Sequence, residues 1–224
     1  SNNQTVLPGA YSVSESAKDG WDSDGGSCDN GETPASLDVG AGETVTCTFT
    51  NTRNQGTIEL TKAWSGTGGQ TTLNIGTTAG AGDVDTQLTG AAGATPLTTG
   101  TNAVNTGAYY VSETGGLTSY GTSLACTDNG SPVTPGTNNS LLVTTGHAVI
   151  CTFTNTRNTG TLQVLKNVDL NGNGDYTDAN ETGATDWQWQ ANAGTDHNTG
   201  DTAITVNTGN YALTETAKID FHQV

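Results

Sequence analysis

Basic residues are scarce in this 224-residue sequence. Lysine and arginine together number 6, against 22 aspartates and glutamates, so the formal net charge is −16 at pH 7. Such a chain repels nucleic acid and anionic membrane surfaces, and it attracts cations, Ca²⁺ above all. The charge balance therefore excludes nucleic acid as a partner.

Long hydrophobic runs are also missing, because no segment approaches the roughly 20 apolar residues that span a bilayer. We therefore expect no membrane insertion in this segment. Only 32% of the residues are hydrophobic and 12% are charged, against about 45–50% and 25% in ordinary globular domains. This mixture excludes long amphipathic helices. The abundant Thr, Gly, Asn and Ser favour short strands joined by turns, so the composition predicts an all-β protein.

Internal repetition organises the sequence. Cys-Thr-Phe-Thr-Asn-Thr-Arg-Asn stands at 47–54 and again at 151–158, an offset of 151 − 47 = 104. Each copy leads into a segment of the form Gly-Thr-apolar-x-apolar-x-Lys, at 56–62 and at 160–166. Because this second offset is also 104, the two motifs belong to one repeating unit.

A third motif, Gly-x-Tyr-x-apolar-x-Glu, occurs three times, at 9–15, 107–113 and 209–215. The order of the motifs defines one complete repeat and two partial ones. We predict the C-terminal part of a repeat at 1–54, a complete β-sandwich repeat at 55–157, and the N-terminal part of a further repeat at 158–224. Two stretches of the complete repeat, 65–82 and 86–106, are rich in Gly, Thr and Ala. They predict strands with little alternation of apolar and polar residues, joined by long loops.

Each motif alternates apolar and polar residues, which is typical of half-buried strands. In the complete repeat a polar side chain ends each apolar face, namely Lys62, Glu113 and Asn155. The partial repeats carry the same positions in incomplete sets: Lys166 with Glu215, and Glu15 with Asn51. A lone buried charge costs several kcal/mol unless it is paired or neutralised. We therefore expect these polar residues to interact.

At these residues the chain resembles the Cna-B-type, or prealbumin-like (SpaA-like), domains of bacterial surface adhesins and pilins. That family opens with Gly-x-apolar-x-apolar-x-Lys, continues with Gly-x-Tyr-x-apolar-x-Glu and an aromatic residue, and closes with a strand ending in Asn. The proline that the family carries between the Glu and the aromatic residue is missing here. The resemblance implies tandem Greek-key β-sandwich repeats, immunoglobulin- or prealbumin-like, arranged in a stalk.

In many members of this family the Lys amine and the Asn carboxamide form an internal isopeptide bond, with the Glu as proton shuttle. Burial would lower the pKa of the Lys and raise that of the Glu, as this chemistry requires. Carried over, the resemblance implies a Lys62–Asn155 bond assisted by Glu113. The alternative is a buried Lys–Glu pair capped by Asn, without covalent closure.

Four cysteines occupy matching places in the repeats. Cys28 and Cys47 fall in the first partial repeat, and Cys126 and Cys151 fall in the complete one. An even count in an exported chain predicts disulfides, and we predict Cys28–Cys47 and Cys126–Cys151. Zinc is the alternative, but there is no Cys-x-x-Cys pair and the three histidines do not recur in register.

An acidic loop follows Lys166. Its alternating oxygen side chains and sixth-position glycine match the opening of a Ca²⁺ loop, although the closing acid stands one residue late. The flanks are strand-like, so the loop is no EF-hand; it resembles loops of B-type repeats in Gram-positive serine-aspartate adhesins. We predict that Ca²⁺ makes it rigid, and the alternative is a turn without an ion. The expected ligands are Asp169, Asn171, Asn173, Asp175, Asp178 and Glu181.

The leading functional hypothesis is a structural segment of an extracellular, cell-surface stalk or filament. Its partners would be neighbouring repeats or further copies of itself. The alternative is an adhesive module that recognises a host protein or glycan, for which Trp187 and Trp189 are the candidate contacts. These two residues share a strand face, and the other interpretation, which we favour, places them in the core. An enzyme would need a nucleophile–base pair in a polar pocket, and the sequence offers none.

The partial repeats leave a further alternative open, because a neighbouring chain could complete each of them, as in donor-strand filaments. The segments 9–21 and 209–221 duplicate one motif, so the two parts do not simply add up to one repeat. We therefore favour a segment of a longer repeat chain.

Overall fold

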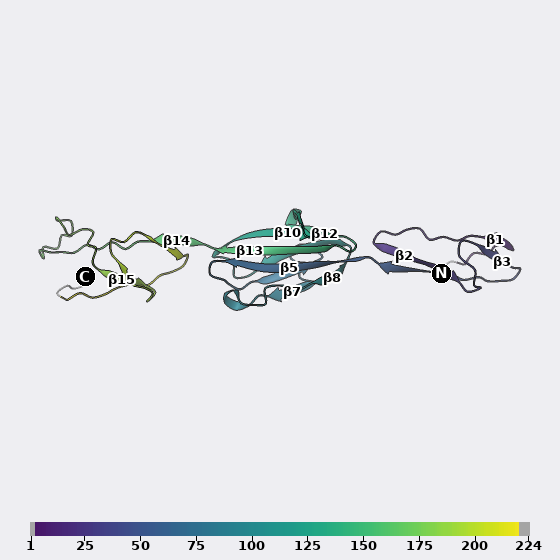
Figure 1. Cartoon of the computed structure of the whole chain (residues 1–224), viewed down its shortest axis with the longest axis horizontal. Helices are drawn as coiled ribbons and strands as arrows, with labels where there is room; N and C mark the ends of the chain where they lie inside the picture. The colour runs from purple at the N-terminus through teal and green to yellow at the C-terminus, as the bar shows by residue number, and fades with distance from the viewer. Residues whose placement is uncertain (1–2, 220–224) are drawn as a thin grey trace. The chain divides into compact units, whose positions relative to one another are not determined.

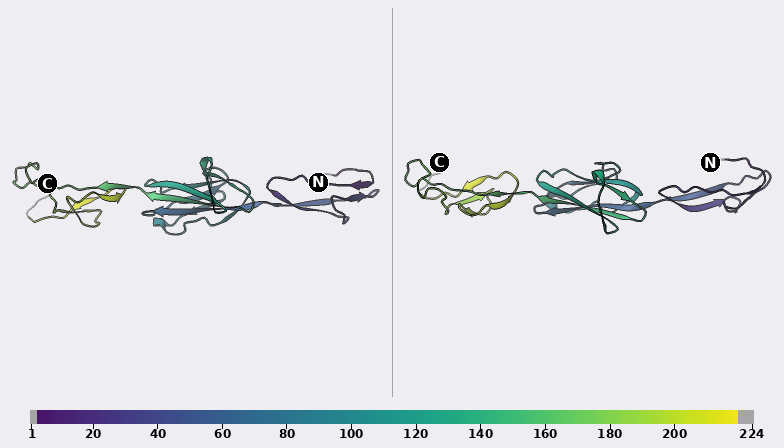
Figure 2. Two further views of the ribbon diagram at one scale, coloured as in Figure 1. Left: turned by 45° about the horizontal axis from the view of Figure 1, so that its top comes forward. Right: turned by 90° about the horizontal axis from the view of Figure 1, so that it is seen from above.

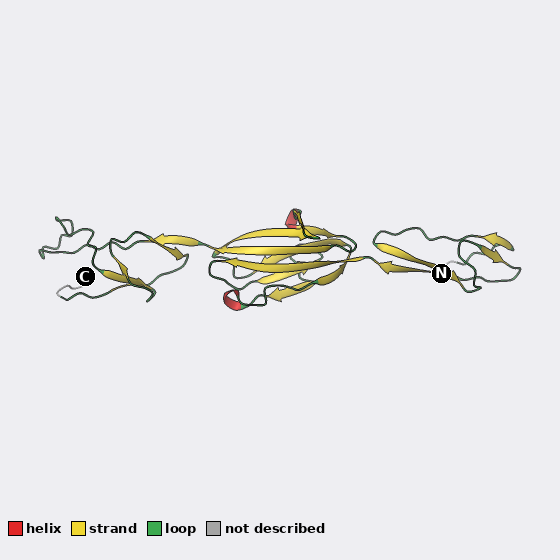
Figure 3. Ribbon diagram, in the orientation of Figure 1, coloured by secondary structure: helices red, strands yellow, loops and turns green. Residues whose placement is uncertain are grey.

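The computed structural model describes residues 3–219, and its regular secondary structure consists almost entirely of strands joined by loops (Figure 1, Figure 3). The exceptions among these residues are two short 3₁₀ helices, Ala91–Gly93 and Thr137–Asn139. The all-β prediction is confirmed. No helix in the described part of the chain has the length and apolar character that a membrane crossing requires.

The chain divides into two compact units. The first comprises the residues up to Ala63 together with Gly68–Gly116 and Thr122–Thr154. The second comprises Trp64–Thr67, Leu117–Gly121 and the chain from Asn155 onward. The division into one complete and two partial repeats stays a prediction.

Two sheets form a sandwich in the middle of the sequence (Figure 2). The five-stranded sheet has the order β11-β10-β13-β5-β8, namely Ser131–Val133, Tyr120–Asp128, Ala148–Arg157, Gln55–Ser65 and Asn102–Asn105. The four-stranded sheet has the order β12-β9-β6-β7, namely Ser140–Val143, Gly107–Thr114, Thr72–Gly76 and Asp85–Leu88.

The core of the sandwich is filled by the alternating apolar residues of both sheets. Ile58 and Leu60 of β5 pack in one buried cluster with Leu73 of β6, Val111 of β9 and Phe153 of β13. Because strand side chains point alternately to the two faces, Thr57, Glu59 and Thr61 of β5 are left on the outer face and are only partly buried. The predicted faces of these strands are therefore correct.

The two predicted partial repeats form smaller sheets. In the first, β1 (Gly9–Tyr11) pairs with β3 (Leu37–Val39), and β2 (Trp21–Cys28) pairs with β4 (Cys47–Arg53). In the last, β14 (Thr159–Leu162) pairs with β17 (Ile204–Asn207). The remaining three strands there have the order β16-β15-β18, namely His197–Asn198, Gln188–Ala191 and Leu213–Glu215.

Strand pairing repeats with the same register. In β5 and β8 Gln55 lies opposite Asn105, and in β14 and β17 Thr159 lies opposite Asn207. The Gly-x-Tyr motif also has one local structure in its three copies, because each tyrosine hydroxyl donates to the backbone carbonyl four residues earlier. The pairs are Tyr11 with Leu7 (2.7 Å), Tyr109 with Asn105 (2.8 Å) and Tyr211 with Asn207 (2.6 Å). The sequence repeats are therefore structural repeats.

Candidate functional site

The central sandwich contains a buried ion pair. Lys62 Nζ lies 3.1 Å from Glu113 Oε1, and the two side chains are 0% and 2% exposed. Lys62 Nζ also donates to the backbone carbonyls of Ala63 (3.0 Å) and Phe153 (3.2 Å). The predicted meeting of the Lys and Glu motifs inside the fold is therefore observed.

Asn155 is the third predicted member of this centre. It is fully buried on β13, the strand that neighbours β5 in the five-stranded sheet. Burial lowers the pKa of Lys62 below its ordinary value of 10.5, against the opposing influence of Glu113. A lowered pKa increases the fraction of neutral amine, which is the nucleophilic form of lysine.

The equivalent pair in the second unit is more open. Lys166 Nζ lies 2.8 Å from Glu215 Oε1 and 3.1 Å from Glu215 Oε2, and the two side chains are 22% and 20% exposed. Lys166 Nζ also stands over the ring of Trp187, at 4.3 Å from the centroid. The sequence repeat therefore places the same two groups together without burying them.

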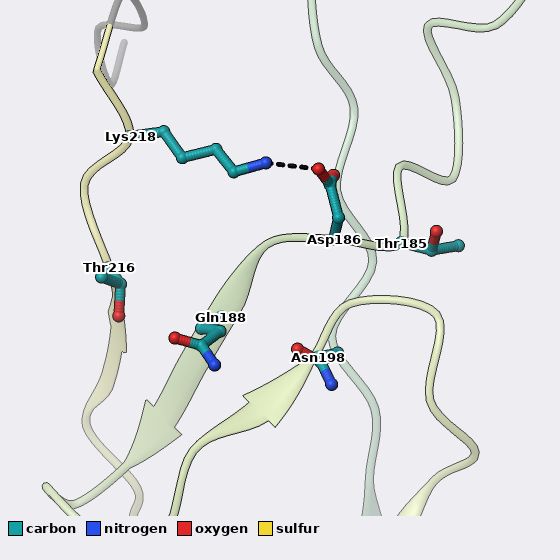
Figure 4. A pocket seen from close by; sticks show the side chains of 6 residues that line it. All are labelled: Thr185, Asp186, Gln188, Asn198, Thr216 and Lys218. Atoms are coloured by element: carbon teal, nitrogen blue, oxygen red, sulfur yellow. Dashed lines mark hydrogen bonds and ion pairs between the residues drawn. The ribbon is translucent and has the colours of Figure 1, made fainter.

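A shallow polar pocket of about 380 Å³ lies in the second unit, and its lining includes Asp186 and Lys218 (Figure 4). Lys218 reaches across it to Asp186, and this hydrogen bond lowers the pKa of Asp186. Lys218 Nζ also lies 4.9 Å from the Trp187 ring centroid. Lys218 was not among the predicted site residues, although its spacing was a signal: Lys218 follows Glu215 by three residues, as Lys18 follows Glu15.

Both tryptophans that were candidates for glycan contacts are buried. Trp187 is 5% exposed and Trp189 is 3% exposed. A ligand-stacking platform needs an accessible ring face, so these residues serve packing inside the second unit. The favoured core position of the two tryptophans is therefore confirmed, and they do not present the surface that the adhesive alternative requires.

Both predicted disulfides are present, Cys28–Cys47 and Cys126–Cys151. Each joins two adjacent strands, β2 to β4 and β10 to β13. Cys126 and Cys151 belong to the buried core of the sandwich. The second bridge thereby fastens the strand that carries Asn155.

The acidic loop is organised by its own side chains. The Asp169 carboxylate accepts backbone N–H groups from Gly172, Asn173 and Gly174, and these bonds, that of Gly174 first, lower the pKa of Asp169. The amides of Asn171 and Asn173 both donate to Asp178 Oδ2 at 2.9 Å. Four of the six predicted ligands thus lie in one hydrogen-bonded loop.

Glu181 closes this loop from inside the fold. It is 1% exposed; its Oε1 accepts the backbone N–H of Leu170 at 2.9 Å, and its Oε2 is buried without a hydrogen-bond partner. Asp175 bonds instead to Thr177, which lowers the pKa of Asp175. Within residues 3–219, no three His, Cys, Asp or Glu side chains are gathered closely enough to hold a metal ion. The Ca²⁺ site therefore stays a prediction.

Comparison with known proteins supports the fold. Residues 1–49 match the family model of a prealbumin-like fold domain, SpaA_2. This match confirms the resemblance predicted from the motifs. Among solved structures, the Bacillus anthracis TIE protein aligns with 90% of this chain at 14% identity and a TM-score of 0.40. The alignment covers 44% of that protein's chain, so the present chain spans less than half of its length. No curated protein matches the sequence significantly.

Proposed function

We propose that this chain is a structural segment of an extracellular, cell-surface stalk or filament. The observation that carries the proposal is the Lys62–Glu113 pair, which lies inside the sandwich with Asn155 buried on the neighbouring strand. A buried charge pair contributes little net stability in itself. Its placement is, however, suited to joining β5 covalently to β13.

The proposed chemistry is a single closure on the chain itself. The neutral amine of Lys62 attacks the side-chain amide carbon of Asn155, a new C–N bond forms, and ammonia leaves. Glu113, 3.1 Å from the amine, takes the proton that the amine loses and returns it to the departing ammonia. The chain would thus be no enzyme, because this reaction happens once and consumes its own side chains.

Such a bond, together with the disulfides, would let a stalk resist unfolding under tension. The intact mass of the oxidised chain tests this. We expect a mass lower than the sequence mass by one ammonia and by two hydrogens for each disulfide. Reduction should raise the mass by the hydrogens alone and leave the ammonia loss in place. Lys62→Arg should show no ammonia loss relative to the mass of its own sequence. A wild-type mass without the ammonia loss would refute covalent closure and leave only the ion pair.

The hypothesis of an adhesive module that binds a host protein or glycan is less well supported. It depends on accessible aromatic side chains in one repeat, and Trp187 and Trp189 are both buried. The charge of −16 also favours a role in which the surface stays solvated. We therefore favour the structural role.

We further propose that Ca²⁺ binds the acidic loop as a structural ion. The residues fit a hard cation, because a fully buried carboxylate oxygen of Glu181 has no partner and the carboxylates of Asp169 and Asp178 stand in the same loop. An uncompensated buried carboxylate is costly, and an ion would offset that cost by drawing the three side chains closer.

The test is a calorimetric titration of the chain with Ca²⁺, followed by hydrogen exchange of residues 167–182. Added Ca²⁺ should release or absorb heat and slow exchange in the loop. Glu181→Gln should abolish both effects, whereas Asp24→Asn, a matched change in the first unit, should leave them unchanged. Exchange that is insensitive to Ca²⁺ in the unsubstituted chain would refute the site.

A further inference from the structure

Four asparagines of this chain are followed directly by glycine, namely Asn30, Asn129, Asn171 and Asn173. In such a pair the backbone nitrogen of the glycine can attack the side-chain amide carbon of the asparagine, because glycine has no Cβ to hinder the approach. The attack closes a five-membered succinimide ring and expels ammonia. In a folded chain the reactivity of each pair depends on the hydrogen bonds that hold the two reacting groups.

The fold holds both reacting groups of the pair in the first repeat. Gly31 N–H donates to the Cys28 carbonyl at 3.1 Å, and Asn30 Nδ2 donates to Glu32 Oε2 at 2.9 Å. The nitrogen that would attack and the amide that would leave must therefore each give up a hydrogen bond before the ring can close. Such bonds stabilise the unreacted state.

The acidic loop holds Asn171 and Asn173 in the same way. Both side-chain amides donate to Asp178 Oδ2 at 2.9 Å. The N–H groups of the two glycines that follow them donate to the Asp169 carboxylate, at 2.6 and 2.8 Å. Three of the four pairs are thus protected twice, once at the attacking nitrogen and once at the leaving amide.

The fourth pair, Asn129 and Gly130, lies at the tip of the hairpin between β10 and β11, where both residues are exposed. Neither Gly130 N–H nor Asn129 Nδ2 donates a hydrogen bond to any group among residues 3–219. A Cβ added at Gly130 would meet nothing within 4 Å, so no neighbouring group shields the nitrogen. Of this side chain only Oδ1 is engaged, because it accepts the backbone N–H of Ala148 at 2.9 Å.

The bond from Ala148 acts on the carbon that would be attacked. Negative charge develops on Oδ1 as a nitrogen adds to Cγ, and a backbone N–H aimed at that oxygen stabilises the charge. The N–H of Asn129 itself donates to the Ala148 carbonyl at 2.9 Å, and this second bond keeps the residue in place. The fold therefore leaves the nucleophile and the leaving group unprotected and supports the oxyanion between them.

We propose that Asn129 is a site of spontaneous deamidation, at which the chain converts its own amide to a carboxylate. The Gly130 nitrogen forms a bond to Asn129 Cγ, and its proton departs with the amide group as ammonia. Water then opens the succinimide at one carbonyl to give aspartate, or at the other to give isoaspartate, whose backbone runs through the side-chain carbon. The reaction takes up one water and releases one ammonia, so it needs no other reactant. It goes beyond the structural role proposed above and does not depend on it.

The first repeat shows that the fold accepts a carboxylate in this position. There the N–H of Asp29 donates to the Thr46 carbonyl at 3.0 Å, and its Oδ1 accepts the Thr46 N–H at 2.9 Å. These are the two contacts that Asn129 makes with Ala148. The aspartate product can therefore keep both bonds, whereas isoaspartate lengthens the backbone and would break them.

Peptide mapping of the folded chain after long incubation at mildly alkaline pH tests the proposal. The mass gain of an amide-to-acid conversion should appear at Asn129 at least about tenfold faster than at the other three asparagines, because tenfold in rate corresponds to roughly one hydrogen bond. In the reduced chain unfolded in urea, all four should react at similar rates. A folded chain in which Asn129 reacts no faster than the other three would overturn the proposal.

Matched variants test the parts of the site. Gly130→Ala should slow the reaction at Asn129, whereas Gly31→Ala, at a glycine with a similar φ (+83° against +80°), should leave it unchanged. Asn129→Asp should keep the slow hydrogen exchange of the Ala148 amide, and Asn129→Ala should speed that exchange about tenfold, the loss of one hydrogen bond. Equal exchange in these two variants would overturn the role given to the Ala148 N–H.

The site can also be separated from covalent closure in the core. The succinimide and the Lys62–Asn155 bond each lack one ammonia, so the peptide that carries the loss tells them apart. Lys62→Arg should abolish the loss in the core and leave the reaction at Asn129 unchanged. Either idea can therefore fail without the other.

Discussion

Replacing Glu113 by glutamine should destabilise the central sandwich much more than the same change at Glu215 destabilises the second unit. Glu113 and Lys62 are 2% and 0% exposed, so the substitution leaves the lysine without a counter-charge in the interior. Breaking a buried pair in this way costs about 3–5 kcal/mol. The Lys166–Glu215 pair is about one-fifth exposed, and water screens it, so Glu215→Gln should cost about 1 kcal/mol or less.

The two units need not unfold together, so a single denaturation curve does not separate the two effects. Native-state hydrogen exchange reports each unit by itself. Glu113→Gln should speed exchange of the β5 and β9 amides by more than about 100-fold. Glu215→Gln should speed exchange in β14 and β15 by less than about tenfold. Equal effects in the two units would refute the argument that burial, and not the ion pair itself, makes the central site sensitive.

Three further results are expected. In a chain whose Lys62 has not closed on Asn155, the folded state has a lowered pKa at Lys62. The unfolded chain then binds more protons between that pKa and 10.5, so the free energy of unfolding should rise with pH across this window. Urea titrations at alkaline pH measure this rise, and the closed chain, whose lysine is part of an amide, should show none. Tyr109→Phe removes the hydroxyl that donates to the Asn105 carbonyl, and thermal unfolding should show a loss of about 0.5–1.5 kcal/mol. Reducing Cys126–Cys151, which closes a loop of sequence separation 25, should lower the free energy of unfolding by about 3 kcal/mol in a denaturant titration. An unchanged unfolding midpoint would contradict the idea that this disulfide stabilises the fold by constraining the unfolded chain.

The sequence predicted the motif-bearing strands well because each has one face in the core and one toward water. In β5, Ile58 and Leu60 are fully buried while their neighbours are only partly so, and the period of two is visible in the letters. The disulfides could be predicted for a related reason, since the cysteines recur in register with the repeats.

The strands between the motifs could not be predicted with the same precision. β6 is buried at four successive positions from Leu73 to Gly76, so its residues do not alternate. Its Asn74 is buried and bonds to Thr114 Oγ1 and to the Thr72 carbonyl. A polar residue of this kind looks like a turn signal in the sequence, and only its partners on the neighbouring strand reveal a place in the core.

The partners of the acidic loop illustrate a second limit of the sequence. The spacing of oxygen side chains predicts six ligands, but Asp175 bonds to Thr177 within its own turn. Glu181, which stands one position late in the motif, is the member that the fold buries. The one-residue shift is therefore no defect of the loop, because Glu181 stands next to the isolated bridge between Asn167 and Thr182, where its side chain is buried.

The comparison of the two Lys–Glu pairs shows where the chemistry of this fold resides. Both pairs come from the same motifs at a separation near 50 residues, and both place the amine about 3 Å from the carboxylate. Only the pair next to β13 is withdrawn from water, and burial there lowers the pKa of its lysine, Lys62. The motifs therefore set the geometry, while the adjacent Asn-bearing strand sets the electrostatics. In the proposed closure, an amine that becomes nucleophilic only once that strand is in place would react with the correct amide and with no other, so closure would follow correct folding.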